Sequence, residues 1–386
     1  MSAVSADRWY ANRRDRGWTC PPVPANVLAF HRSLDGYAPT PLVELPAVAA
    51  ELGVGRVFAK DESSRLGLPA FKALGASWAM HRALAELSAA GRAEVGPVTF
   101  VTATDGNHGR AVARTARLLG HQARITVPDG VHPAAIAAIE AEGASVAVVG
   151  GSYDDAVAAA ARDAAADPGA ILLQDTAWPG YETVPAWIVE GYATLFAELD
   201  EQVRARDMQA PDLVVVPVGV GSLAQAAVAH YRSRPDQART SLISAEPVTA
   251  ACAFASLRAG RAVTVPTAVT TMAGLNCGTP SSLAWPYLRD GLDGAAAVTD
   301  QEAAAAGATL RAGGVDAGPC GWAALAAVRR ALAEPGAREH LGVGEASVLV
   351  LIVTEGAAAN PAGLGSASPY NHQASAARPF TSRGFR

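Results

Sequence analysis

One lysine stands apart in the segment "GLPAFKALGA" (67–76), where Lys72 is surrounded by small and apolar side chains. Of the 31 basic residues, 29 are arginine, and only Lys60 and Lys72 are lysine. A neutral amine can form a Schiff base with a carbonyl group, whereas the permanently charged guanidinium cannot. An apolar pocket would lower the pKa of the lysine and supply that amine. Lys72 is therefore a candidate catalytic residue, and the alternative is a surface lysine at a helix start.

A glycine-rich segment, "PVGVGSLAQA" (217–226), follows an expected strand and begins an expected helix. Glycine lets the backbone approach an anion closely, and free N–H groups at a helix N-terminus bind phosphate. Gly219, Gly221 and Ala224 also fit the pattern G-x-G-x-x-A. Glu246 ends the next expected strand, where a dinucleotide site would have its ribose-binding acid. The segment predicts a phosphate site, and the alternative is a tight turn without a ligand.

Polar residues are crowded into a third segment, "TATDGNHGRAVA" (102–113). Asn107 can both donate and accept hydrogen bonds and so could hold a hydroxyl group. Asp105 could move a proton if a cation lies nearby. The alternative is a turn that caps a helix. His108 is not expected to bind a metal, because no second ligand lies at helical spacing from it.

Short β-branched segments alternate with alanine-rich segments along the chain. This predicts parallel sheets with helices on both faces, arranged as two α/β domains. Strands are expected at 98–103, 123–128, 145–150, 170–175, 212–218, 241–247 and 347–356, and helices at 109–119, 133–142, 153–166 and 222–234. Ligands collect at the carboxyl ends of such strands, where the polar segments fall. Lys60, in "FAKDES", fits an ordinary charge at a strand end.

The composition argues against several classes of partner. The net charge is −5 and no long Lys/Arg run occurs, so no nucleic-acid partner is expected. No apolar stretch reaches the ~18 residues of a membrane span, and the N-terminus lacks a signal-peptide core, so we expect a cytoplasmic protein without a membrane partner. The four cysteines show no CxxC spacing, which argues against structural zinc and a disulfide framework.

Six segments, spread in order over most of the chain, carry a resemblance to a known family. They are "SRLGLPAFKALGAS" (64–77), "TATDGNHGRAVA" (102–113), "QDTAWPGYETVPAWIVEGYATL" (174–195), "GVGSLA" (219–224), "TTMAGLNCGTPS" (270–281) and "TEG" (354–356). Together they resemble the fold-type II, tryptophan-synthase β-like enzymes that use pyridoxal 5'-phosphate. Within that family, "DGNHGR", "QDTAWPGYE" and "MAGLNCG" are most similar to the 2,3-diaminopropionate ammonia-lyases.

The resemblance implies a cofactor site. Lys72 would hold pyridoxal phosphate as a Schiff base, Asn107 would bond its ring hydroxyl, and Thr354 would face the pyridine nitrogen. The phosphate would be held by Gly219, Val220, Gly221 and Ser222. The family fold has two doubly wound, mostly parallel-sheet domains with the cofactor between them. A small domain (71–190) would be inserted in a large one (1–70 and 191–386), and two chains would form a homodimer.

The resemblance also implies a reaction. Asp105 and Asp175 correspond to two acids near the reacting atoms, and a substrate with a second ammonium group needs carboxylates beside it. The expected chemistry is loss of the β-amine from 2,3-diaminopropionate, giving pyruvate and ammonia, with Lys72 or an aspartate taking the α-proton. The alternative on the same cofactor is a serine/threonine dehydratase or a β-replacement enzyme that acts on another β-substituted alanine.

Three departures from the family pattern leave the exact substrate open. Pro179 replaces an acid in "WPGY", Val353 precedes Thr354, and Asp316 begins "DAG" where "ESG" is usual. Cys252 and Cys277 lie where relatives can carry a cysteine pair near the site entrance, and the alternative is two buried free thiols.

Two hypotheses from other functional classes remain. An NAD-dependent oxidoreductase would use the glycine-rich segment and Glu246, but it leaves Lys72 and "DGNHG" unexplained. A non-catalytic binding protein would hold pyridoxal phosphate and turn over no amino acid.

Overall fold

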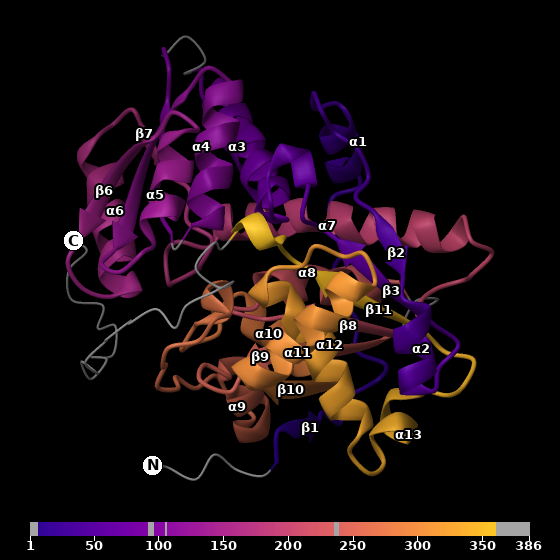
Figure 1. Ribbon diagram of the computed structural model, residues 1–386. Coiled ribbons are helices and arrows are strands. Elements are labelled where there is room, and N and C mark those ends of the chain that lie inside the picture. The colour runs from indigo at the N-terminus through magenta and orange to yellow at the C-terminus, as the bar shows by residue number, and fades with distance from the viewer. Residues whose placement is uncertain (1–6, 92–95, 105, 235–238, 360–386) are drawn as a thin grey trace.

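The computed structural model describes residues 7–91, 96–104, 106–234 and 239–359, which form two β-sheets with surrounding helices (Figure 1). The larger sheet has the strand order β1-β10-β9-β8-β11-β3-β2. In that order the strands are Trp9–Ala11, Gly294–Val298, Ser241–Pro247, Leu213–Pro217, Val348–Val353, Arg56–Asp61 and Leu42–Glu44. Every pair from β10 to β3 is parallel, while β1 and β2 add antiparallel edges.

The smaller sheet is parallel throughout and has the order β6-β5-β4-β7. Its strands are Ser145–Val149, Gln122–Pro128, Thr99–Ala103 and Ala170–Leu172. The predicted α/β class with mostly parallel sheets is confirmed. The proposed domain limits at residues 71 and 190 stay a prediction.

Strand β7 ends at Leu172, so the expected strand at 170–175 is too long. The side chain of Gln174 takes over the pairing with β4: its Oε1 accepts from Ala103 N at 2.9 Å and from the Thr102 hydroxyl at 2.9 Å. Because a side chain satisfies these groups, the backbone can leave the sheet before Asp175.

Thirteen α-helices lie in the described part of the chain. Those up to α7 are α1 (Val27–Arg32), α2 (Pro46–Leu52), α3 (Lys72–Ala89), α4 (Asn107–Leu118), α5 (Pro133–Glu140), α6 (Tyr153–Ala166) and α7 (Thr183–Arg204). The rest are α8 (Ser222–Arg232), α9 (Cys252–Ala259), α10 (Ala284–Gly291), α11 (Asp300–Ala312), α12 (Pro319–Leu332) and α13 (Ala337–Leu341).

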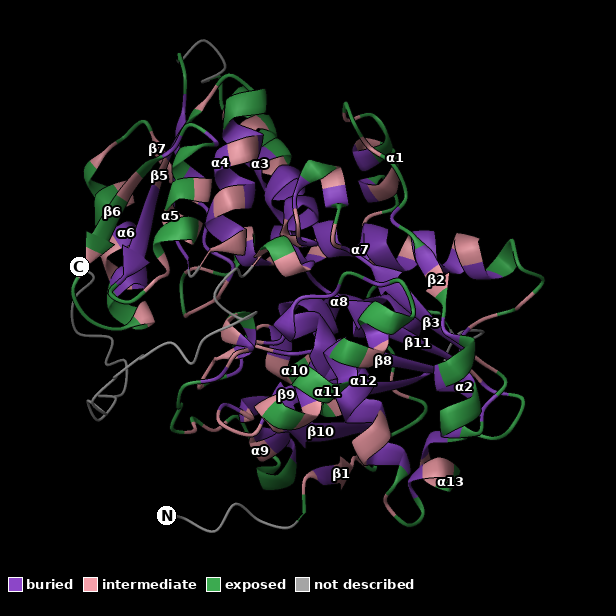
Figure 2. Ribbon diagram, in the orientation of Figure 1, coloured by how far each residue is buried: buried purple, intermediate pink, exposed green. Residues whose placement is uncertain are grey.

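Alternate residues of the central strand β8 enter different cores. Val214 and Val216 pack into the core that also holds buried residues of α3, α7 and α8, whereas Leu213 and Val215 pack with α12. Because both faces of β8 pack into a core, every residue of the strand is apolar, and its sequence shows no alternation of apolar and polar residues. The first core continues into the smaller sheet through Phe100 and Ile125. Figure 2 shows buried segments in both sheets, while the edge strand β6 is largely exposed.

Helices α3 and α7 join the two sheets by packing against each other at glycines (Figure 1). A Cβ atom at Gly191 would lie 2.5 Å from the backbone oxygen of Leu74, and one at Gly75 would lie 2.6 Å from Tyr192 Cε1. Only glycine permits this approach, which occurs in the first turn of the helix that begins with Lys72.

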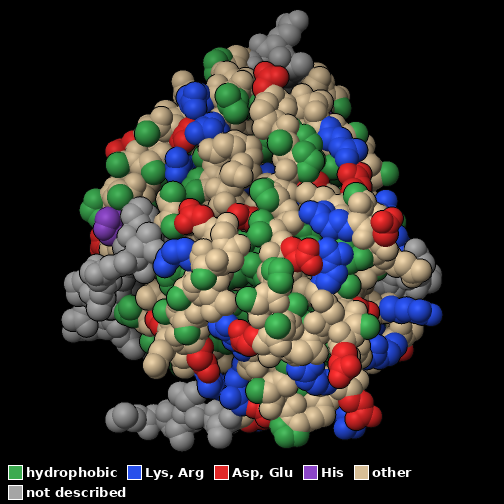
Figure 3. Space-filling model, turned by 45° about the vertical axis from the view of Figure 1, so that its right-hand side comes forward, with side chains coloured by type: hydrophobic (Ala, Val, Ile, Leu, Met, Phe, Trp, Pro, Cys, Tyr) green, Lys and Arg blue, Asp and Glu red, His purple; other side chains and the backbone are tan. Residues whose placement is uncertain are grey.

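The visible surface mixes both signs of charge. On the face shown in Figure 3, Lys/Arg and Asp/Glu side chains are interspersed, without a broad patch of one sign. Among the described residues, no helix combines the length and apolar character needed to cross a bilayer.

Candidate active site

The predicted site segments meet at the carboxyl ends of strands. β4 leads into "TDGNHG", β8 into the glycine-rich loop, and β11 into Thr354. Lys72 reaches this edge because the residues before it run beside the end of β11. Phe71 N donates to Thr354 O at 3.1 Å, and Gly356 N donates to Pro69 O at 2.9 Å. Lys72 therefore starts α3 beside the carboxyl end of β11.

Lys72 and Asp175 form the central contact of the site. The Lys72 ammonium donates to Asp175 Oδ2 at 2.6 Å, and the two side chains retain 23% and 10% exposure. Burial is the largest single effect and lowers the pKa of Lys72. The charge and hydrogen bond of Asp175, together with Tyr192 and Cys277, outweigh burial, so the pKa lies above its usual value. The expectation of a lowered lysine pKa is therefore wrong, because the pocket contains a carboxylate.

The same contact with Lys72 keeps the carboxyl group of Asp175 ionised. Burial raises the pKa of Asp175, but Lys72 and then His108 outweigh burial and hold it well below its usual range. His108 Nδ1 lies 3.9 Å from Asp175 Oδ2, and its Nε2 lies 2.8 Å from Leu173 O. Because a carbonyl oxygen only accepts, Nε2 carries the proton. Asp105, the other predicted acid, lies outside the described residues.

The glycine-rich loop connects β8 to α8 and contacts the acid-bearing segment. Gly221 has φ +101°, and a Cβ atom there would lie 2.8 Å from Leu288 Cδ1. A Cβ atom at Gly219 would lie 3.0 Å from Gly274 O. The Ser222 hydroxyl donates to Asp175 O at 3.3 Å. The structure thus brings the loop, Asp175 and Lys72 together, although they are far apart in the chain.

Asn107 and Thr354 lie beside an acid that the sequence analysis did not single out. Asn107 Nδ2 donates to Glu355 Oε2 at 2.7 Å, while Cys320 N, in the first turn of α12, donates to Glu355 Oε1 at 3.1 Å. Burial raises the pKa of Glu355. The hydroxyl of Thr354 is buried and has no hydrogen-bond partner among the described residues. An unpaired buried hydroxyl is costly, so it marks a position where a partner group fits.

Two residues were therefore missed. Glu355 carried a signal, because a charged residue directly after a buried strand stands at the ligand-binding edge. Tyr192 carried none, since it lies within the long helix α7, and only tertiary packing brings it against Phe71, with ring centroids 4.7 Å apart, and near Lys72.

Two further interpretations need correction. Lys60 is not an ordinary strand-end charge: it lies inside β3, has no exposed surface and pairs with Glu198 at 2.8 Å. Glu246 is not free for a ribose. Its carboxylate accepts from Ala253 N at 2.7 Å and Phe254 N at 2.8 Å, where it caps α9. This removes the acid on which the dinucleotide reading depended.

The remaining expectations concern cysteines and departures from the family pattern. Cys252 is buried and Cys277 is half-buried, and no disulfide joins them. Pro179 occupies a turn in which Tyr181 N donates to Trp178 O at 2.8 Å and Gly180 has φ +88°. Proline followed by glycine is the typical pair for a type II turn, so backbone geometry accounts for Pro179.

Comparison with known proteins agrees with this geometry. The family described as pyridoxal-phosphate dependent enzymes matches residues 34–355. A diaminopropionate ammonia-lyase of Salmonella typhimurium is 40% identical over 281 residues, which are 68% of this chain and 69% of that protein. The Escherichia coli enzyme of the same name is 35% identical over 350 residues, covering 85% of this chain and 86% of its own.

Solved structures give the same result in three dimensions. The Escherichia coli diaminopropionate ammonia-lyase in complex with an aminoacrylate–pyridoxal phosphate azomethine intermediate superposes with a TM-score of 0.80 at 33% identity, covering 91% of this chain and 94% of that chain. The same enzyme in complex with D-serine gives a TM-score of 0.82 at 32% identity, with the same coverage. With the sequence match spanning most of its length and the fold shared over 91% of it, this chain belongs to the pyridoxal-phosphate dependent enzymes of fold type II.

Proposed function

We propose that this protein is a lyase that removes the β-amino group of 2,3-diaminopropionate and yields pyruvate, with both nitrogens released as ammonia. The observation that carries the proposal is the contact of 2.6 Å between Lys72 Nζ and Asp175 Oδ2. A substrate with a second ammonium group needs a carboxylate beside the reacting lysine, whereas the neutral hydroxyl of serine or threonine does not. The dehydratase alternative is therefore not favoured.

The residues present fit pyridoxal phosphate. Lys72 is partly exposed, while the other lysine is completely buried in an ion cluster. Only glycine fits at Gly219 and Gly221 in the tight turn before α8, because a Cβ atom would lie 3.0 Å from Gly274 O and 2.8 Å from Leu288 Cδ1, respectively. Thr354 has an unused hydroxyl. We assign the cofactor phosphate to Gly219, Val220, Gly221 and Ser222. We assign the ring hydroxyl to Asn107 and the pyridine nitrogen to Thr354.

The chain's own residues would then divide the proton chemistry. When bound, the cofactor supplies an electron sink for negative charge at the substrate Cα. The amine of Lys72, in its neutral form, takes the proton from the substrate Cα. Asp175, released from Lys72, holds the β-ammonium group in place. Asp105 is proposed as the second acid, and Glu355 orients Asn107 through the bond of 2.7 Å between them.

The experiment that tests this function is pyruvate release from the purified, cofactor-loaded protein. Both enantiomers of 2,3-diaminopropionate are compared with L-serine, D-serine and L-threonine at equal concentration. We expect diaminopropionate to react faster than either hydroxy amino acid. Faster release from serine or threonine would assign the protein to the dehydratases, and no release from any of them would reject the lyase.

We also propose that the protein is a cytoplasmic homodimer with a small domain at 71–190 inserted in the large one. The family habit supports the dimer, and the strands of the smaller sheet, which lie between residues 99 and 172, support the domain limits. Sedimentation equilibrium should give twice the chain mass, and a monomer mass would contradict the dimer.

A further inference from the structure

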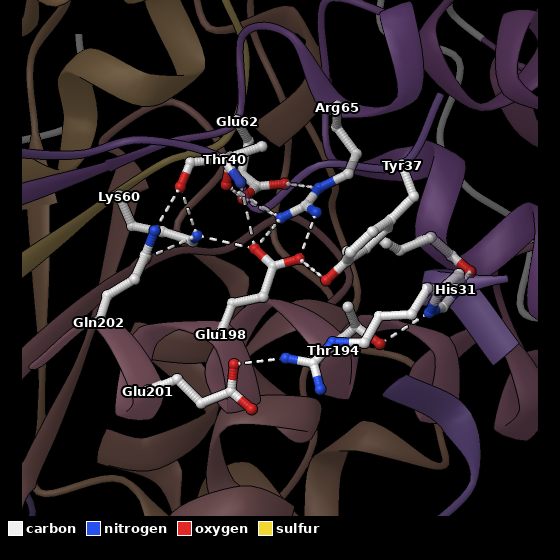
Figure 4. Close-up of polar contacts among 12 residues, drawn as sticks. His31, Tyr37, Thr40, Lys60, Glu62, Arg65, Thr194, Glu198, Glu201 and Gln202 are labelled. Carbon is white, nitrogen blue, oxygen red and sulfur yellow. Dashed lines mark hydrogen bonds and ion pairs between the residues drawn. The ribbon is translucent and has the colours of Figure 1, made fainter. Parts of the chain in front are cut away.

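Glu198 of α7 lies at the centre of a buried ion cluster (Figure 4). We call Lys60, Glu62, Arg65 and Glu198 the Glu198 cluster; none of these side chains has exposed surface. Arg65 donates to Glu198 at 2.6 and 2.8 Å and to Glu62 at 2.7 and 2.7 Å. Lys60 donates to Glu198 at 2.8 Å. Two cations thus face two carboxylates.

The cluster continues a polar stripe on α7. Gly191, Thr194, Glu198 and Gln202 follow one another at spacings of three and four residues, so they lie on one face of the helix. Gln202 Oε1 accepts from Lys60 at 3.0 Å. The Thr194 hydroxyl lies 2.7 Å from His31 Nδ1, and His31 Nε2 donates to Leu74 O at 3.0 Å.

This stripe of α7 contacts the polypeptide on both sides of Lys72. Before Lys72 it holds Arg65, and after Lys72 it meets Leu74 through Gly191 and through the His31 bridge. The connecting segment is strained, since Leu66 has φ +51°, a conformation that a side-chain-bearing residue adopts at a cost. Such a conformation persists when surrounding contacts over-determine it, and Arg65 is the adjacent anchor.

Burial of four charges is a poor way to gain stability. Desolvation offsets much of the attraction, and apolar residues of similar volume often stabilise a protein as well or better. The best-attested use of buried polar groups is to specify register. A slip of α7 by one turn would remove the partners of Glu198, Thr194 and Gln202 together.

We propose that Glu198 is a positioning residue for the reaction: the Glu198 cluster sets the register of α7 against the segment 60–74 and thereby places the Lys72 amine against Asp175. The proposal goes beyond the lyase reaction but rests on the proposed role of Lys72 as its reacting amine. It predicts that disturbing the cluster changes the surroundings of Lys72 more than an equal disturbance elsewhere does.

The reactivity of Lys72 can be measured without any cofactor. The chain has two lysines and Lys60 is fully buried, so acetic anhydride reports on Lys72, which peptide mass spectrometry separates from the terminal amine. Asp175, Tyr192, Cys277, His108 and Glu355 are the groups that act on the charge of Lys72. The Asp175→Asn variant shows how far the rate rises when the contact is lost.

The test compares Glu198→Gln with Asp293→Asn in the cofactor-free protein. Asp293 is also a buried acid held by two arginines, at 2.8 Å from Arg14 and 2.7 Å from Arg232. Asp293 precedes β10 and therefore lies at the amino ends of the parallel strands, whereas the site lies at their carboxyl ends. We expect Glu198→Gln to raise the acetylation rate of Lys72 at about pH 9 by roughly tenfold, equivalent to one pKa unit. Asp293→Asn should leave the rate unchanged.

A second variant keeps the test decisive if Glu198→Gln does not fold. Glu198→Asp retains the charge but withdraws the carboxylate toward α7 by one methylene group, and it should raise the rate by a smaller factor. An unchanged rate in the folded Glu198 variants, or an equal rise in Asp293→Asn, overturns the proposal. Because no substrate is involved, a failure of diaminopropionate to react counts against the proposed function and not against this placement.

Discussion

The two lysines of this chain lie at the two ends of one connection and have opposite surroundings. Lys60 uses its three N–H groups on Glu198, Gln202 and the Thr40 carbonyl, and it is completely buried. Lys72 faces the carboxylate of Asp175 and keeps part of its surface exposed. Burial lowers the pKa of Lys60 even though the carboxylates of Glu62 and Glu198 oppose it, whereas Asp175 raises that of Lys72.

The difference shows how one residue type serves structure in one place and chemistry in another. An ammonium group has three donors, and a site that satisfies them all leaves no room for a substrate. At Lys72 the partner, Asp175, lies on the loop between β7 and α7, and the amine has one carboxylate partner and keeps part of its surface exposed, so a substrate group can take the place of the contact.

Lys72→Ala should have the largest effect. Without the amine no Schiff base can form, so the visible absorption band of the bound cofactor and the activity should both be lost. Arg32→Met, which breaks the exposed ion pair with Glu201 away from the site, serves as the control and should retain the band. Spectra of the two variants after incubation with pyridoxal phosphate decide the point, and a band that persists in Lys72→Ala would refute the assignment.

Asp175→Asn should lower kcat by about 10²-fold, because the β-ammonium group would lose the carboxylate that holds it in place at the reacting atoms. It also removes the main charge that raises the pKa of Lys72. The matched control is Asp163→Asn, whose carboxylate forms an exposed pair with Arg124. Steady-state kinetics with diaminopropionate measure both, and similar values of kcat in the two variants would contradict the role of Asp175.

Lys60→Met should mainly reduce stability. Removing one partner of a buried ion pair leaves an uncompensated charge and costs about 3–5 kcal/mol of unfolding free energy. Urea unfolding measures this. Arg32→Met breaks the exposed pair with Glu201 and should cost less than about 1 kcal/mol. A loss for Lys60→Met as small as the Arg32 loss would mean that the Glu198 cluster is not held as the structure indicates.

The pH dependence of stability should show the smallest difference. Arg65 and Lys60 lower the pKa of Glu198 to about 2 against the opposing effect of burial. A carboxyl whose pKa is lower in the folded state contributes stability that is complete above its unfolded pKa near 4.5 and is lost as pH falls toward 2. Glu198→Gln should flatten this acid limb in thermal unfolding curves recorded between these values. An unchanged limb would show that Glu198 is not strongly paired.

Much of the fold could be predicted because its signals are local. Strand and helix alternation follows from periodicity, and the loop at 219–222 follows from glycines between a strand and a helix. The predicted strand at 170–175 was too long, because the side chain of Gln174, and not its backbone, forms the hydrogen bonds to β4 beyond the end of β7.

The amino-acid sequence by itself determined the strand–helix alternation and the glycine-rich turn between β8 and α8, and it made Lys72 a candidate, because each of these depends on neighbours in the chain. Only the tertiary structure decided the environments of the two lysines. Lys72 meets an acid 103 positions away and Lys60 meets one 138 positions away. The charge state of a buried amine depends on the groups that packing brings within a few ångströms, and no local pattern encodes that distance.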